Sequence, residues 1–285
     1  MNYQSYDDLA NCIRGNVWKI PTNADVVVGI PRSGMIPALM IAELLNRRCA
    51  DLDAFCEGRM MSYGTRGGLM RSGRLGKVVV IDDVVNSGKS LDKVRERLAP
   101  LAGQYDIKYG CVYVESEKAK GMVDFWMEDI SQPVKTAFIK EWNVMHLFKN
   151  GMMHSMWDLD GLVCKDPPCD RDTEAYEAYL PNAIPMVMPT NKIGAFVTYR
   201  LEKYRAVTEE WLRNHGIEYG QLMMFPSMDR RERNLRQSSS QYKAERYADA
   251  PWAQLFYESS KRQAEEIHYL TGKPVWCYEN GRVYK

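Results

Sequence analysis

The segment that most constrains this chain is an apolar run, Val78 to Ile81, that passes into two aspartates and then into small residues. Four consecutive β-branched residues predict a strand buried on both faces, as in a parallel sheet. The small and polar residues from Asn86 to Ser90 predict a turn that opens a helix. Backbone N–H groups converge at such a helix start and favour a phosphate, whose close approach Gly88 permits. The segment therefore predicts a phosphate-binding loop.

The end of this segment, Gly88 to Ser90, also matches the end of the P-loop of nucleoside triphosphatases. That motif requires glycine at position 83, where this chain has Asp83. We expect Asp82 and Asp83 to accept hydrogen bonds from paired ribose hydroxyls. The segment instead resembles the phosphoribosyl pyrophosphate (PRPP) loop of type I phosphoribosyltransferases. The resemblance assigns PRPP binding to Asp82, Asp83, Asn86, Ser87, Gly88, Lys89 and Ser90.

A second strand with a tight loop, Val26 to Gly34, precedes another predicted helix. It resembles the pyrophosphate-binding loop of the same family. The resemblance implies that Arg32 meets pyrophosphate oxygens, while Ser33 and Gly34 offer backbone donors. In that family this loop often holds a non-proline cis peptide bond, and the sequence alone does not show whether this chain has one.

The glycine- and arginine-rich segment between these two loops, Arg59 to Gly73, resembles the family's flexible catalytic loop. Glycines permit such a loop to close and exclude water. The resemblance assigns to Arg66 or Arg71 the stabilisation of departing pyrophosphate. A solvated basic hairpin is the alternative interpretation.

These resemblances imply a reaction in which an acceptor displaces pyrophosphate from the anomeric carbon of PRPP, with Mg2+ neutralising the leaving group. The acceptor is expected to be a small molecule carrying a nitrogenous base, and a purine, a pyrimidine such as orotate and an unusual metabolite all stay open. Acceptor choice in this family comes from flanking segments, here the N-terminal residues with Glu115 to Trp142. Because this fold commonly pairs, a homodimer is also expected.

A second constellation of acids follows the short strand His154 to Trp157, with Asp158 and Asp160 before a glycine. Residues two apart in an extended segment point the same way, so both acids are expected to serve one site. Asp158 is suited to attack a phosphoryl group, and Asp160 to protonate the leaving oxygen and then activate water.

The segment His154 to Val163 resembles the first motif of the haloacid dehalogenase-like phosphohydrolases. The resemblance implies phosphate binding by Thr198, which ends the strand Ala195 to Thr198, and by Lys243. It also implies a Mg2+ site formed by Asp158, Asp160 and Glu258. Two acids are usual in the last motif of that family, but Ser259 follows Glu258 here.

Apolar runs alternate with helix-period segments along the chain, which predicts an α/β fold of mostly parallel sheets. The length of 285 residues favours two domains. We expect a type I phosphoribosyltransferase fold at 1–150 and a haloacid dehalogenase-like Rossmannoid fold with little or no cap at 151–285. Helices are expected at Pro37 to Arg48, Leu91 to Leu98 and Leu201 to His215, and a polar loop at Asp229 to Gln241.

The charge balance, 38 Lys and Arg against 37 Asp and Glu, predicts no attraction to nucleic acid or anionic membrane. The 7 dispersed cysteines indicate reduced thiols. The N-terminus lacks the pattern of a signal peptide, and no apolar run is long enough to cross a bilayer. We therefore expect a cytoplasmic protein.

Together the two halves suggest consecutive reactions: the first makes a ribose 5-phosphate conjugate and the second removes its phosphate. Two alternatives stay open. In the first, the chain is a non-catalytic, nucleotide-sensing regulator. In the second, it is an active transferase with a degenerate, structural phosphatase-like domain.

Overall fold

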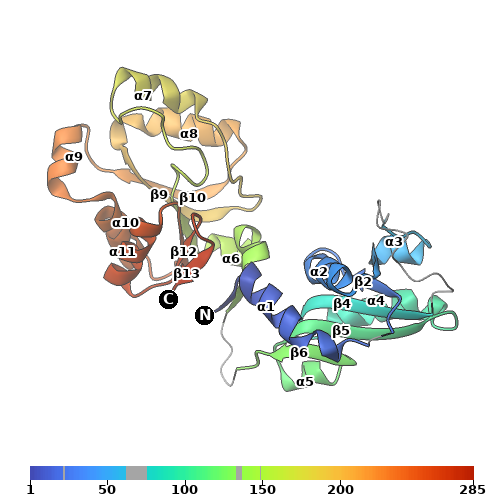
Figure 1. The fold of residues 1–285 in the computed structure, drawn as a ribbon. Coiled ribbons are helices and arrows are strands. Elements are labelled where there is room, and N and C mark those ends of the chain that lie inside the picture. Colours follow the sequence, from blue (N-terminus) through green and yellow to red (C-terminus); the bar gives the residue numbers. More distant parts are fainter. Residues whose placement is uncertain (22, 62–75, 133–136, 148) are drawn as a thin grey trace. The chain divides into compact units, whose positions relative to one another are not determined.

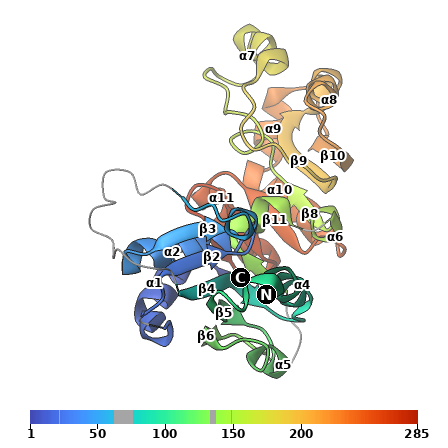
Figure 2. The ribbon, with the colours of Figure 1, turned by 90° about the vertical axis from the view of Figure 1, so that its right-hand side faces the viewer.

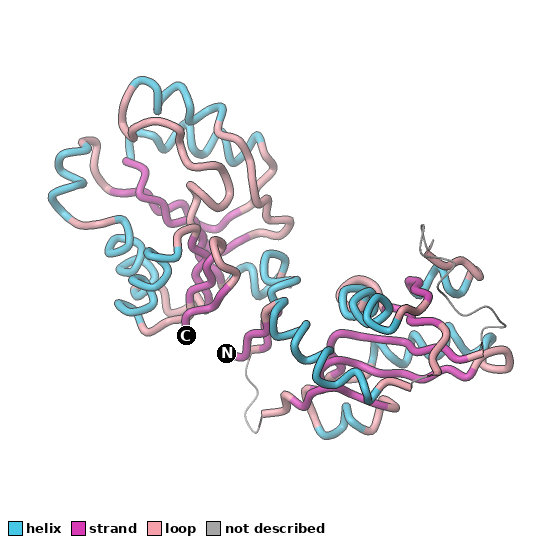
Figure 3. Tube along the Cα trace, viewed as in Figure 1, coloured by secondary structure: helices cyan, strands magenta, loops and turns pink. Residues whose placement is uncertain are grey.

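A computed structural model describes residues 1–21, 23–61, 76–132, 137–147 and 149–285 of the chain. These residues form two compact units, 2–137 and 138–285, the second including Met1. Each unit contains a mostly parallel sheet flanked by helices, so the α/β class is as predicted (Figures 1 and 3). The first unit ends at Ala137, before the boundary expected between residues 150 and 151. Among the described residues, no helix is both long and apolar enough to cross a membrane.

The N-terminal unit is organised around five parallel strands in the order β3-β2-β4-β5-β6. Its central strands are valine-rich and buried, as expected where helices cover both faces of a sheet. The strands of this unit are β1 (Asn2–Gln4), β2 (Val26–Gly29), β3 (Arg48–Asp51), β4 (Lys77–Val85), β5 (Asp106–Val114) and β6 (Phe125–Asp129).

The helices of the N-terminal unit are α1 (Tyr6–Asn16), α2 (Met35–Leu45), α3 (Leu52–Cys56), α4 (Lys89–Leu98) and α5 (Glu117–Lys120). The apolar side of α4 packs on Val26, Val28 and the facing valines of β4. Gly29, which points to the other side of β2, lies against α2, where a Cβ atom would stand 2.9 Å from the Ala38 side chain. Helices α2 and α4 therefore cover opposite faces of the sheet.

The direction of chain winding reverses between β2 and β4. The chain runs from β2 through α2 to β3 at one edge, and from β4 through α4 to β5 toward the other edge. The loops after β2 and β4 therefore separate at the carboxyl ends of two adjacent strands. In open α/β sheets this reversal point is where ligands bind.

The C-terminal unit has a six-stranded sheet in the order β10-β9-β8-β11-β12-β13, in which only β13 is antiparallel to its neighbour. Figure 2 shows β8, β9, β10 and β11 of this sheet with helices around them. Its strands are β8 (Ser155–Trp157), β9 (Ile193–Leu201), β10 (Tyr219–Phe225), β11 (Leu255–Glu258), β12 (Val275–Cys277) and β13 (Arg282–Tyr284), and the unit also contains β7 (Phe138–Lys140).

The helices of the C-terminal unit are α6 (Lys149–Met153), α7 (Glu174–Tyr179), α8 (Arg205–Asn214), α9 (Arg230–Arg236), α10 (Ser239–Ala248) and α11 (Lys261–Thr271). Its winding reverses between β8 and β11, because β8 leads to β9 and β10 on one side and β11 leads to β12 on the other. The carboxyl ends of β8 and β11 therefore form the equivalent ligand-binding position of this sheet.

Two sequence predictions about the C-terminal unit are wrong. The predicted helix from Leu201 begins only at Arg205, because β9 continues through Tyr199 and Arg200 to Leu201. The predicted loop at Asp229 to Gln241 instead contains α9 and the start of α10. In that segment, side-chain caps satisfy the first N–H groups of both helices, which stabilises helices even where most residues are charged.

Candidate functional site

The loop after β4 forms the first part of a candidate anion site. β4 ends at Val85, and α4 begins at Lys89 after Gly88, which adopts a left-handed conformation with φ 75°. Asn86 and Ser87 in the loop are exposed, as are Lys89 and Ser90 in the first turn of α4. Exposed N–H groups at the start of a helix attract phosphate, and a left-handed residue there is most easily glycine.

The loop after β2 lies directly against the middle of β4. Gly34 is buried, and a Cβ atom there would lie 2.6 Å from the Ile30 carbonyl oxygen and 2.8 Å from that of Ile81. The Ile30 N–H donates to the Ile81 carbonyl at 3.0 Å, which joins the start of this loop to β4. The Pro31–Arg32 peptide bond is cis, and the Arg32 side chain is exposed.

The two aspartates of the first site lie inside β4, because the strand extends through them to Val85 rather than ending at Ile81. Asp82 is half-buried, whereas Asp83 is only 3% exposed. Each carboxylate accepts the next backbone N–H, that of Asp83 for Asp82 and that of Val84 for Asp83, at 2.9 Å in both cases. Asp82 is thus the more accessible carboxylate at this strand end, although the sequence predicts the same role for both.

The structure therefore brings the two loops that the sequence identifies to neighbouring strand ends. The loop after β4 offers N–H groups at the start of α4, and the loop after β2 offers the exposed guanidinium of Arg32. The half-buried carboxylate of Asp82 lies on β4. This combination suits a ligand that carries both phosphate and hydroxyl groups. The remaining candidates, Arg66 and Arg71, lie outside the described residues.

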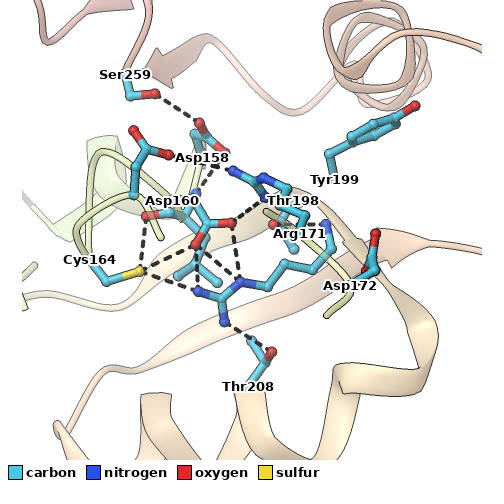
Figure 4. Close-up of polar contacts among 12 residues, drawn as sticks. Asp158, Asp160, Cys164, Arg171, Asp172, Thr198, Tyr199, Thr208 and Ser259 are labelled. Atoms are coloured by element: carbon cyan, nitrogen blue, oxygen red, sulfur yellow. Dashed lines mark hydrogen bonds and ion pairs between the residues drawn. The ribbon is translucent and has the colours of Figure 1, made fainter. Parts of the chain in front are cut away.

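The second candidate site lies at the reversal point of the C-terminal sheet. Asp158 follows β8 and Glu258 ends β11, and the Lys243 ammonium of α10 is 2.8 Å from a carboxylate oxygen of each. Lys243 also donates to Gln263 Oε1 at 3.2 Å. Ser259 Oγ donates to Asp158 Oδ2 at 3.2 Å (Figure 4). The three charged side chains are at most 5% exposed.

Asp160 has different partners. Its carboxylate accepts from the Arg200 guanidinium, with Nη2 at 2.5 Å, and from Arg171 Nη1 at 2.7 Å (Figure 4). Arg200 is 1% exposed and also donates to Thr208 Oγ1 at 3.2 Å. Asp160 therefore belongs to a buried ion-pair network of its own.

Asp158 and Asp160, which the sequence predicts to serve one site, share no cation in these contacts. β8 ends at Trp157, and the chain turns immediately afterwards at Gly161, with φ 80°. The alternation of an extended strand therefore no longer applies to this pair. Gly161 is required at this turn because a Cβ atom there would lie 2.9 Å from Ser259 Cβ and Oγ.

The Mg2+ site predicted from Asp158, Asp160 and Glu258 does not fit this arrangement. Asp158 and Glu258 share the Lys243 ammonium, and Asp160 pairs with two guanidinium groups. Over the ranges that the structure describes, no group of three or more His, Cys, Asp or Glu side chains is arranged to hold a metal ion. Cations of the protein occupy the positions next to these carboxylates.

The surroundings of Asp158 and Asp160 shift the pKa values of these two acids in opposite directions. Burial raises the pKa of Asp158 above its ordinary value, and the Glu258 charge adds to this against the lowering effect of Lys243. Burial alone would also raise the pKa of Asp160, but Arg200 and Arg171 outweigh it and hold that pKa well below its usual range. The two arginines therefore favour the ionised form of Asp160, whereas the sequence predicts that this carboxyl donates a proton.

The phosphate ligands predicted for this unit, Thr198 and Lys243, are both buried. Thr198 lies within β9, next to β8, and its hydroxyl accepts the Arg200 N–H at 3.3 Å. Sequence reasoning missed Arg200 and Arg171. A signal for Arg200 existed, because it stands two residues after Thr198 and so shares a side of the same strand.

Comparison with known proteins identifies the first half of the chain. Residues 3–148 match the family model described as the phosphoribosyl transferase domain. The xanthine-guanine phosphoribosyltransferase of Cereibacter sphaeroides is 28% identical over an alignment of 141 residues, and the match covers 45% of this chain and 79% of the relative.

Solved structures are similar to part of the chain. The xanthine-guanine-hypoxanthine phosphoribosyltransferase of Helicobacter pylori is 17% identical, with a TM-score of 0.37, and the match covers 50% of this chain and 93% of that chain. The purine phosphoribosyltransferase of Pyrococcus horikoshii is 22% identical, with a TM-score of 0.35, covering 49% and 92% of the two chains.

Proposed function

The chain belongs to the family of phosphoribosyl transferase domains, and from this premise we propose that its N-terminal unit transfers ribose 5-phosphate from PRPP to a nitrogenous base. The observation that carries the proposal is the pairing of the two loops after β2 and β4 at the reversal point of the sheet. A ligand there meets an anion-binding helix start and an exposed arginine at the same time.

In this proposal the residues bind and orient the substrate. The N–H groups from Asn86 to Ser90 hold the 5-phosphate, and Asp82 accepts from ribose hydroxyls. Arg32 neutralises pyrophosphate, and Mg2+, when bound with it, supplies further positive charge to the leaving group. A ring nitrogen of the base forms the bond to the anomeric carbon as the bond to pyrophosphate breaks, and the nitrogen loses its proton. Positioning and charge stabilisation provide most of the catalysis.

The name of the Cereibacter relative makes xanthine and guanine the first bases to test. The experiment is mass spectrometry of products after incubation with PRPP, Mg2+ and a panel of bases. The proposal predicts one new mass, a base joined to ribose phosphate or to ribose. PRPP binding without a product from any base would instead favour a non-catalytic, nucleotide-sensing regulator.

For the C-terminal unit we propose a haloacid dehalogenase-like fold and removal of the 5′-phosphate from the transferase product. Support comes from Asp158 at the end of the central strand β8, with Thr198 on one neighbouring strand and Glu258 on the other. Asp158 forms an aspartyl phosphate as the bond to the riboside oxygen breaks and that oxygen takes a proton from solvent water, and a water molecule then hydrolyses the aspartyl phosphate and releases inorganic phosphate. Linking the two sites in one chain raises the local concentration of the intermediate.

Two observations favour a second candidate, a C-terminal unit with a structural role. Asp160 is held as an anion by two arginines, and Ser259 stands where a second acid is usual. The proton of the leaving oxygen is therefore not assigned to Asp160.

Phosphate release discriminates between the two candidates. The phosphatase proposal predicts release that requires both PRPP and the base and that disappears in Asp158→Asn. The exposed Asp249→Asn, in the same unit, is the matched control and should keep full release. If phosphate release persists in Asp158→Asn, or if the wild-type protein releases no phosphate, the phosphatase proposal is wrong and the structural role of the C-terminal unit is favoured.

A further inference from the structure

Three cations surround the acids of the C-terminal site, and they differ in what they can still bind. An ammonium has three N–H donors. Those of Lys243 have three partners, namely Asp158 Oδ2 and Glu258 Oε2, each at 2.8 Å, and Gln263 Oε1 at 3.2 Å. The side chain is only 2% exposed. Lys243, the phosphate ligand that the sequence predicts, therefore has its donors in use.

The guanidinium of Arg200 also donates its hydrogen bonds to other residues of the protein. It donates to Asp160 through Nε and Nη2, to Cys164 Sγ at 3.3 Å and to Thr208 Oγ1 at 3.2 Å. With 1% exposure it has no access to a ligand that arrives from solvent. Its contacts fit the role of holding Asp160.

Arg171 differs from both. Its side chain is 31% exposed, and within the described residues it donates to Asp160 Oδ2 at 2.7 Å and, at a long 3.5 Å, to Asp166 Oδ1 (Figure 4). A guanidinium has five N–H donors in a planar fork, so Arg171 keeps donors available after both contacts. Asp166 is 67% exposed, and so distant and exposed a carboxylate is a weak competitor for this fork.

The position of Arg171 is fixed by its neighbour. Asp172 forms an ion pair of 2.9 Å with Arg233, and the two side chains are 3% and 5% exposed. The Arg233 guanidinium in turn lies 4.7 Å from the centre of the Tyr199 ring on β9. The segment that carries Arg171 is therefore anchored to β9, so that less freedom of the chain at this position remains to be lost on binding.

We propose that Arg171 is the residue that binds the phosphate of a phosphate monoester in the C-terminal site, in place of Lys243. The fork of a guanidinium matches two oxygens of a phosphate, and its charge offsets that of the dianion. On binding, the phosphate replaces Asp166 on Nη2 while Nη1 keeps its contact with Asp160. This inference rests on the proposed phosphatase function but makes its own prediction about binding.

The first test does not require turnover. The full-length protein is treated with phenylglyoxal, which modifies accessible arginines, with and without inorganic phosphate, and the sites are mapped by mass spectrometry. Phosphate is expected to slow modification of Arg171 several-fold, and to leave the exposed Arg213 of α8 unchanged. Because the modified peptide identifies the site, phosphate bound in the N-terminal unit does not interfere. An Arg171 that reacts equally with and without phosphate, or not at all, overturns the inference.

The second test uses para-nitrophenyl phosphate as substrate. Loss of one charge-assisted interaction is expected to raise KM about tenfold to a hundredfold in Arg171→Gln. Arg171→Lys should recover part of this loss, since it restores the charge without the fork, and Arg213→Gln should behave as wild type. An unchanged KM in Arg171→Gln refutes the inference while the phosphatase proposal stands. Protection of Arg171 in a protein without Asp158-dependent turnover supports phosphate binding and refutes the phosphatase.

Discussion

The close contact of the loop after β2 with β4 predicts that Gly34→Ala damages the N-terminal site. The new Cβ would lie 2.6 Å and 2.8 Å from the carbonyl oxygens of Ile30 and Ile81, and 3.1 Å from Asp82 Cα. All three atoms belong to the backbone, so the loop after β2 must move away from β4. Overpacking typically costs about 1–3 kcal/mol, and loss of the Ile30–Ile81 hydrogen bond about 0.5–1.5 kcal/mol. We therefore expect the N-terminal unit to lose about 2–4 kcal/mol of unfolding free energy.

The assay for this prediction combines hydrogen exchange of β4 peptides, which reports on the N-terminal unit alone, with calorimetric titration of PRPP. We expect faster exchange in β4 and an affinity for PRPP reduced at least about tenfold. Gly15→Ala in α1 is the matched control, because nothing lies within 4 Å of the new Cβ. It should be neutral or stabilise the unit by up to about 1 kcal/mol. Wild-type exchange and wild-type affinity in Gly34→Ala would refute the reasoning.

Two further predictions concern buried charges and thiols. Asp160→Asn should lower the unfolding free energy of the C-terminal unit by about 3–5 kcal/mol in urea denaturation, because it leaves the Arg200 charge buried without an anion. The exposed Asp166→Asn should change this free energy by less than about 1 kcal/mol. Equal effects of the two substitutions would contradict this account. Burial raises the pKa of Cys12 to about 12 and that of Cys49 to about 11, so at about pH 8 neither should react with a disulfide reagent until the protein unfolds. Rapid labelling of either thiol in the native protein would show that it is not buried.

The secondary structure that the sequence predicts well consists of buried strands with continuous apolar runs. The strand predicted at Val78 to Ile81 lies within β4, and all four of its residues are buried. The prediction is poorer where a strand carries polar groups. β3 (Arg48–Asp51) was missed, and Arg48 was assigned to the preceding helix, because charged residues at strand ends read as helix surface.

The start of α10 carries a helix-capping signal in the sequence that the prediction of a loop does not take into account. Ser238 and Gln241 form a capping box at the start of α10, a spacing that is visible in the sequence. Reading this segment as a polar loop gave its many charged residues more weight than the cap.

The two candidate sites differ in how far the sequence could define them. The PRPP loops are contiguous, and each carries its own turn, small residues and helix start, so their location follows from local patterns. The partners of Asp160 come from Arg171 and Arg200, one on a loop and one on another strand. Only the folded chain brings these residues together, and their charges reverse the role that spacing alone suggested for Asp160.

The most direct measurement of the central claim is calorimetric titration of PRPP into the full-length protein at millimolar Mg2+. The account predicts saturable binding of one PRPP per chain, weakened about tenfold or more by Asp82→Asn, which removes a charged hydrogen-bond acceptor. The exposed Asp92→Asn of α4 should bind as wild type does. Absence of PRPP binding by the wild-type protein, or equal affinity in Asp82→Asn, would contradict the account.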